Sequence, residues 1–184
     1  ALVVGEVALV ETTNTAKVGS PDSADTPAPV INSTDAARDN SSATGANSLA
    51  SATNSTANGA SSVASGINSS ATGFSADATG LISSANGAYS LASGINSTAN
   101  GVAATATGDN SNASGVQANA SAASSNAIGV LAQATAINAN AIGVQADASG
   151  INSSAIGVQA NADGVNSNAI GVQANATADN SNAI

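Results

Sequence analysis

The sequence predicts an all-β solenoid of parallel, fourteen-residue coils, and three columns of small residues support this fold class. Glycine recurs every fourteen residues without exception from Gly45 to Gly171. One alanine column runs at the same spacing from Ala43 to Ala183, and a second begins at Ala50. A strict period of this length is typical of architectures in which each unit stacks on the one before it.

Each unit is expected to form one flattened coil, because fourteen residues suit two strands of four or five residues joined by two tight turns. Ten coils spaced ~4.8 Å apart would make a rod of roughly 48 Å. The chain has one Phe, one Tyr and no Trp, Met or Cys, so the interior must be thin. Side chains alternate between the two sides of a strand, and the inside takes the small ones. The residues predicted to line this interior are Ala127, Gly129, Ala134, Ala141, Gly143, Ala148, Ala155, Gly157 and Ala162.

The same alternation leaves a stripe of Ile and Val pointing outward along the rod. Long exposed apolar stripes usually mark an interface, so the stripe predicts self-association, most simply as a symmetric oligomer around the rod axis. The predicted oligomer interface consists of Val116, Ile128, Val130, Ile142, Val144, Ile156, Val158, Ile170 and Val172. Earlier units carry Thr, Asn or Ser in the Ile column, so the interface is expected to be tighter after about residue 116.

Most units open with asparagine, which tolerates a left-handed backbone at turns and whose amide can stack from coil to coil. Ile82 and Ser124 interrupt this column. The fixed glycine further along each unit is expected to have a positive φ or a close backbone neighbour. The predicted turn ladder consists of Asn54, Asn68, Asn96, Asn110, Asn138, Asn152 and Asn166.

Residues 1–39 lie outside the repeat, and residues 40–184 form the repeat domain. Ala1 to Val10 is rich in Val and Leu and is expected to form short strands, whereas three prolines predict an extended loop over 19–30. The segment would either cap the first coil or pair with another subunit by strand addition. The sequence ends in the middle of a unit, which suggests a fragment of a longer protein.

Charge excludes several classes of partner. The net charge is −9, and no Lys or Arg occurs after Arg38. Such a surface does not neutralise phosphates, so binding to nucleic acid or to an anionic membrane surface is not expected. No stretch approaches the ~20 apolar residues of a membrane-spanning helix, so this part of the chain is not expected to insert into a membrane.

No catalytic constellation is found in the sequence. The chain has no His or Cys, so its many serines have no partner that could activate them. Asp77 and Asp147 share one column but lie five coils apart, about 24 Å, which is too far for joint acid–base work or for one metal ion. We therefore expect neither an enzyme nor a cofactor or metal site.

The unit N-S-x-A-I-G resembles the head repeat of trimeric autotransporter adhesins with YadA-like heads, most clearly at residues 152–157 and 166–171. The resemblance covers residues 40–184. It implies a left-handed parallel β-roll, a homotrimer of chains packed side by side, and an outer-membrane anchor beyond this sequence. It also implies an extracellular adhesin that attaches to host matrix, cells or other surfaces. Coils before about residue 120 depart from the pattern, because Thr, Asn or Ser replaces the Ile.

Two hypotheses about function follow. In the first, the chain is an adhesin head, with a candidate ligand surface at Phe74, Tyr89, Gln145, Gln159 and Gln173. In the second, it is a structural subunit of an extracellular filament, assembled end to end or by exchange of the strand at Ala1 to Val10.

Overall fold

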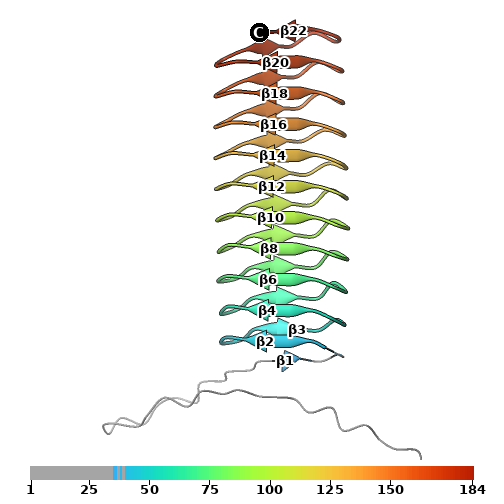
Figure 1. Cartoon of the computed structure of the whole chain (residues 1–184), viewed down its shortest axis with the longest axis vertical. Helices are drawn as coiled ribbons and strands as arrows, with labels where there is room; N and C mark the ends of the chain where they lie inside the picture. Colours follow the sequence, from blue (N-terminus) through green and yellow to red (C-terminus); the bar gives the residue numbers. More distant parts are fainter. Residues whose placement is uncertain (1–34, 37, 39) are drawn as a thin grey trace, which may run out of the picture. The chain divides into compact units, whose positions relative to one another are not determined.

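The computed structural model describes residues 35–36, 38 and 40–184, which form one β-solenoid (Figure 1). Its strands belong to two parallel sheets of eleven strands each, one made of the even-numbered strands and the other of the odd-numbered ones. Each strand pairs with the strand fourteen residues further on, as in the register Ala141↔Ala155. No helix occurs in the described residues. The predicted all-β solenoid of fourteen-residue coils is confirmed.

The strands are very short. The even-numbered strands have three residues, except for the last, and the odd-numbered strands have two. The even-numbered strands are β2 (Ser42–Thr44), β4 (Thr56–Asn58), β6 (Ser70–Thr72), β8 (Ser84–Asn86), β10 (Thr98–Asn100), β12 (Asn112–Ser114), β14 (Asn126–Ile128), β16 (Asn140–Ile142), β18 (Ser154–Ile156), β20 (Asn168–Ile170) and β22 (Asn182–Ala183). The odd-numbered strands are β1 (Asp35–Ala36), β3 (Leu49–Ala50), β5 (Val63–Ala64), β7 (Asp77–Ala78), β9 (Leu91–Ala92), β11 (Thr105–Ala106), β13 (Asn119–Ala120), β15 (Gln133–Ala134), β17 (Asp147–Ala148), β19 (Asn161–Ala162) and β21 (Asn175–Ala176).

The expected strand length of four or five residues is wrong, because the turns take up more of each coil. Every coil contains two residues with a left-handed backbone, one at each turn, such as Asn152 (φ 57°) and Gln159 (φ 56°). The turn residues still bond from coil to coil: the N–H of Gln159 donates to the carbonyl of Val144 at 2.9 Å. The backbone ladder therefore continues through the turns even where the strands end.

The interior consists of small side chains stacked in columns. The six alanines predicted to lie inside, from Ala127 to Ala162, are completely buried. Columns of Ser and Ala, represented by Ser153 and Ala160, complete the interior. A buried methyl group contributes only about 0.8 kcal/mol. Stability therefore depends on many small contributions repeated in every coil.

One expectation about the interior needs correction. Gly129, Gly143 and Gly157 share the alternation of the buried alanines, yet they lie at the turn and are partly exposed. Their φ angles of +136° to +140° turn the chain there instead of continuing the strand. The column of Ser153, which was not assigned to either side from the sequence, is buried because it shares the inward side with Ala155.

The solenoid begins before the first complete unit. β1 pairs with β3, and Ala36 lies in register with Ala50, so part of the segment set apart as residues 1–39 already belongs to the ladder. The signal in the sequence is Ala36 itself, which stands fourteen residues before Ala50. The strands expected at Ala1 to Val10 and the loop expected over 19–30 lie outside the described residues.

Candidate functional site

Each coil has two turns of different construction, which lie at opposite edges of the solenoid. The glycine turn follows an even-numbered strand and consists of three residues, such as Gly157, Val158 and Gln159. The asparagine turn follows an odd-numbered strand and consists of three residues, such as Gly164, Val165 and Asn166. The third residue of both turns is left-handed, with φ between 52° and 60° along the whole solenoid. Only the glycine turn also has a positive φ at its first residue.

The asparagine turn carries a ladder of side-chain amides. The seven residues predicted to form it all have φ between 56° and 58°. The amide nitrogen of Asn54 donates to the amide oxygen of Asn68 at 2.9 Å, and the pair Asn138 and Asn152 repeats this distance. Hydrogen bonds from one coil to the next thus hold these side chains in a row along the edge.

The glycine turn carries a second amide row in the late coils. The amide nitrogen of Gln159 donates to the oxygen of Gln145 at 3.1 Å, and that of Gln173 donates to Gln159 at 3.3 Å. These three glutamines were predicted as ligand contacts. They lie directly beside the Val column of the apolar stripe, since each follows a valine in the chain.

The predicted interface residues lie on the outside of the solenoid. Their Ile column stands at the ends of the even-numbered strands, and their Val column stands at the second position of the glycine turn. Ile142 is half-buried, and the other eight have exposed fractions of 36% to 73%. The two columns run side by side from β14 to β20.

A second apolar column was not predicted from the sequence. It occupies the second position of the asparagine turn, at the opposite edge of each coil, and its large members have exposed fractions of 39% or more. The signal was present as the last residue of each repeat unit, but Thr, Asp and Ala interrupt it. Its large members are Ile67, Leu81, Ile95, Ile137, Ile151 and Val165.

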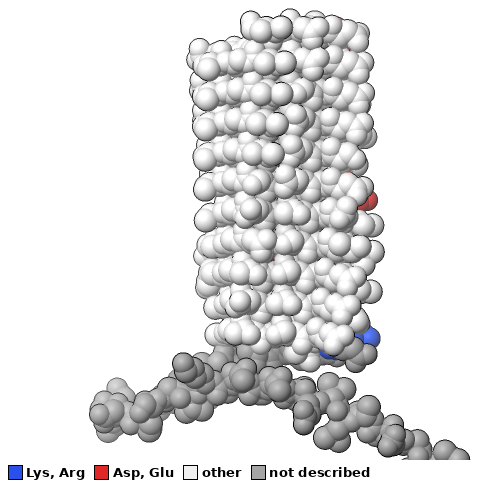
Figure 2. Space-filling view, viewed as in Figure 1, with Lys and Arg blue, Asp and Glu red and all other residues white. Residues whose placement is uncertain are grey.

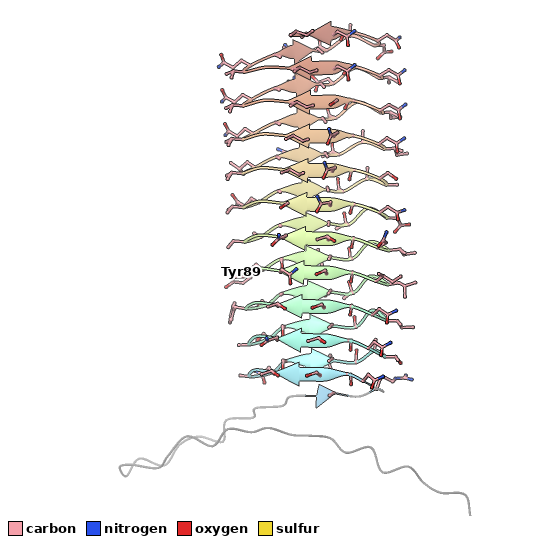
Figure 3. The ribbon with its side chains drawn as sticks, viewed as in Figure 1. Tyr89 is labelled. Carbon is pink, nitrogen blue, oxygen red and sulfur yellow. The ribbon has the colours of Figure 1, made fainter. Side chains whose placement is uncertain are left out.

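Two aromatic side chains stand together on the glycine turns of the early coils. The ring centroids of Phe74 and Tyr89 are 5.3 Å apart, with the planes inclined at 76°, an edge-to-face contact. Both residues are at least half exposed. Figure 3 shows Tyr89 pointing away from the solenoid at one edge.

Charge is confined to part of the surface of the described coils. The outward positions of the even-numbered strands carry no charged residue. The outward positions of the odd-numbered sheet include Asp77, Asp147 and Asp163. Figure 2 shows one broad face on which acidic atoms appear only at an edge and basic atoms only beside the first coil.

Two of these carboxyls have perturbed acidity. Burial raises the pKa of Asp77. Burial also raises the pKa of Asp147, and the negative charge of Asp163 in the next coil raises it further. Asp163 itself accepts a hydrogen bond from the hydroxyl of Ser149 at 2.6 Å. Asp77 and Asp147 are therefore partly desolvated acids, and their ionisation lowers the stability of the folded chain.

The described residues contain no group of three His, Cys, Asp or Glu side chains arranged to hold a metal ion. None of the described residues forms a helix long and apolar enough to cross a membrane. The buried serine hydroxyls either donate to a carbonyl three residues earlier, as Ser97 does to Gly94 at 2.7 Å, or have no protein partner. The outer surface of the described coils thus consists of apolar columns, amide rows and a polar face.

Comparison with known proteins places these features in a family. The family model described as the YadA head domain repeat matches residues 39–62, 50–76, 92–115, 148–167 and 162–184, which together make up more than half of the chain. No curated protein sequence matches the chain. Among solved structures, the chain is similar to the collagen-binding domain of the Yersinia adhesin YadA. The two are 28% identical over 74% of this chain and 68% of that one, with a TM-score of 0.47. The chain therefore belongs to the YadA head-repeat family, and its β-solenoid is a head of the trimeric autotransporter adhesin type.

Proposed function

We propose that this solenoid is the binding head of a bacterial surface adhesin, and that it acts as a homotrimer of chains packed side by side. The observation that carries the proposal is the row of exposed Ile and Val along a face without charge. In a single chain this row would leave a long apolar surface in water, which soluble proteins rarely retain unless it is an interface. The oligomer-interface residues from Val116 to Val172 would be covered by neighbouring chains.

The two faces of the solenoid suit different tasks. The face of the even-numbered strands carries the Ile column and no charge, so it suits the side turned toward the other chains. The face of the odd-numbered strands carries Asp77, Asp147, Asp163 and many Asn, Ser and Thr, so it suits the side turned toward solvent and ligand. A polar surface repeated in every coil favours attachment through many weak contacts to an extended target, which gains strength by multivalency.

The ligand class that fits this surface is an extended extracellular molecule, such as a host matrix protein or a cell-surface polymer. Membership of the YadA head-repeat family supports a location at the bacterial cell surface, in a protein anchored in the outer membrane. The role requires no catalysis and no cofactor. The two aromatics and three glutamines predicted as ligand contacts lie next to the Val column, so covering that column would also cover part of them.

Binding of the 184-residue chain to immobilised collagen, laminin and fibronectin tests this role. We expect binding to at least one of them, and we expect Asn119→Lys together with Asn161→Lys on the polar face to weaken it without changing the oligomer mass. The matched control places the same charges on the opposite face, with Ser70→Lys and Ser154→Lys. It should lower the oligomer mass, because that face is the one turned toward the other chains. Absence of binding to all three, combined with fibres in electron micrographs, would contradict the proposal and favour the filament subunit.

A further inference from the structure

The two turns at opposite edges of a coil vary together along the chain. The asparagine column is interrupted at two places, Ile82 and Ser124. In the same two units, and in no other, the third residue of the glycine turn is a large apolar residue, Tyr89 in one and Leu131 in the other. Wherever the glycine turn has Asn, Gln or Ser at this position, the unit opens with asparagine.

Nothing inside one chain accounts for this coincidence. The two positions are separated by a strand of three extended residues, about 10 Å, and lie at opposite edges of the solenoid. Each stacks only on its own column, as the separate amide rows of Asn138 with Asn152 and Gln145 with Gln159 show. The two units carry different pairs, Ile with Tyr and Ser with Leu, so a copied unit does not explain them either.

Ile82 also adopts an unfavourable backbone conformation. Its φ is +56°, a region that β-branched residues avoid, and its side chain is 53% exposed. Asparagine fills the neighbouring positions at 68 and 96 without this cost. An exposed, strained, apolar residue where a better one is readily available points to a contact outside the chain.

We infer that the asparagine turn of one chain packs against the glycine turn of a second copy of the chain, coil by coil, so that no asparagine faces a large apolar residue across this contact. This inference rests on the proposed self-association and specifies its geometry. Three copies around an axis parallel to the rods meet through two different surfaces of each chain, because a three-fold contact is heterologous. The two turns are those surfaces, and equivalent coils of parallel chains lie at the same height.

The residues at the two turns complement one another under this arrangement. In the late coils the asparagine of one chain meets the glutamine of the next, and two amides can exchange hydrogen bonds. In the unit of Ile82 the aliphatic side chains of Leu81 and Ile82 meet Tyr89, whose ring is steadied by Phe74 at 5.3 Å. An amide facing an apolar ring would lose a hydrogen bond on burial, which explains why the asparagine is absent there. The two apolar columns, Val144 and Ile151 among them, flank the same contact.

Disulfide crosslinking tests the inference directly, because the chain contains no cysteine. The double variant Asn138→Cys/Gln145→Cys is oxidised and run on a non-reducing gel. We expect three chains to be linked, because the thiol introduced at position 138 of one chain would lie within disulfide reach of the thiol at position 145 of the next. The control Asn138→Cys/Gln173→Cys shifts one thiol by two coils, about 10 Å, and should give about tenfold less linked product. Neither single variant should form linked dimers.

Each other outcome identifies what has failed. Linked dimers from Gln145→Cys alone would show that like turns meet, and a wild-type trimer in which the double variant stays unlinked would exclude turn-to-turn contact. Both results would overturn the inference and leave the proposed trimer intact. A monomeric wild-type chain would overturn both. A ladder of ever larger linked species would support the pairing of turns but contradict the closed trimer of the proposed function.

Discussion

The glycine turn and the asparagine turn close the same coil and differ in how strictly they constrain the sequence. Both end in a left-handed residue. The glycine turn also begins with a backbone of φ +121° to +142°, and its glycine has no substitute in ten coils. The first residue of the asparagine turn has no positive φ, and alanine replaces glycine there at Ala52, Ala122, Ala136 and Ala178.

This difference shows that close approach alone does not make a glycine indispensable. A methyl group on Gly143 would lie 2.2 Å from the carbonyl oxygen of Gly157, and one on Gly150 would lie 2.0 Å from that of Gly164. Crowding is therefore similar at the two turns. Only at the glycine turn does it coincide with a backbone conformation that alanine rarely adopts. The asparagine turn can shift to accept a methyl group, and the glycine turn has no such freedom.

The largest expected effect comes from exchanging these glycines. Gly143→Ala should lower the free energy of unfolding by about 3 kcal/mol or more, because strain and overpacking add. Gly150→Ala should lower it by only about 1 kcal/mol, the low end of the cost of overpacking. Thermal unfolding followed by circular dichroism measures both, and the first variant should melt roughly 10 °C below the wild type. Equal losses would show that the two turns are constrained alike.

Charges placed on the two apolar columns give the next largest effect. Val144→Lys at the glycine turn and Ile151→Glu at the asparagine turn should each shift the chain toward monomer, because each would bury an unpaired charge. Combining them should partly restore the assembly, since opposite charges would then face each other across chains. Sedimentation at several protein concentrations measures the shift, with Val144→Glu/Ile151→Glu as the control that should not recover. Recovery in that control would contradict the pairing.

Restoring the regular pattern around Ile82 should raise the free energy of unfolding, by less than the changes described above lower stability or assembly. Ile82→Asn with Tyr89→Gln reproduces the residues of the unit that opens at Asn138, relieves the left-handed isoleucine and completes the amide ladder. We expect the free energy of unfolding to rise by about 1 kcal/mol. The reverse change, Asn96→Ile, should lower it by about 1–2 kcal/mol. Chemical denaturation provides the numbers, and a loss in the double variant would argue against strain at Ile82.

The smallest effect concerns the acids on the polar face, outside both turns. Because the folded-state pKa of Asp147 is raised above its ordinary value, the folded chain holds this proton more tightly than the unfolded chain. This contribution to stability is present at low pH and is lost as the pH rises through the raised pKa. Asp147→Asn should therefore raise the melting temperature at about pH 7 and flatten its dependence on pH. Asn161→Asp, in the same column, should do the opposite, and an unchanged pH profile in both variants would contradict the desolvation.

Much of this fold can be predicted from the sequence, and particular residues show how. The unbroken spacing of Gly45 to Gly171 predicts the coil, and the alternation around Ala141 predicts which alanines are buried. The same alternation places Gly143 inside the solenoid, which is wrong, because the alternation of side chains along a strand does not show where the strand ends and the turn begins. A period of fourteen residues locates each coil but does not show which residues form the strands and which form the turns. The predicted strands are therefore longer than the observed ones.

The apolar columns on the outer surface are harder to predict from the sequence, for a different reason. The Val column stands out because valine fills it without interruption from Val102 to Val172. The column of Ile137 and Ile151 was missed because the same position holds Asp109 and Ala123 in other units. Interior columns admit only small residues, whereas surface positions accept many. Their pattern becomes visible only when the structure shows which residues share an edge.

The solution mass of the chain, measured by light scattering after gel filtration, tests the central claim that the outward apolar columns are covered by other copies of the chain. A closed trimer has three times 17.0 kDa, about 51 kDa, and this mass should not change with dilution well above the dissociation constant. A mass of 17.0 kDa at every concentration would mean that the columns stay in water. That result would contradict the account.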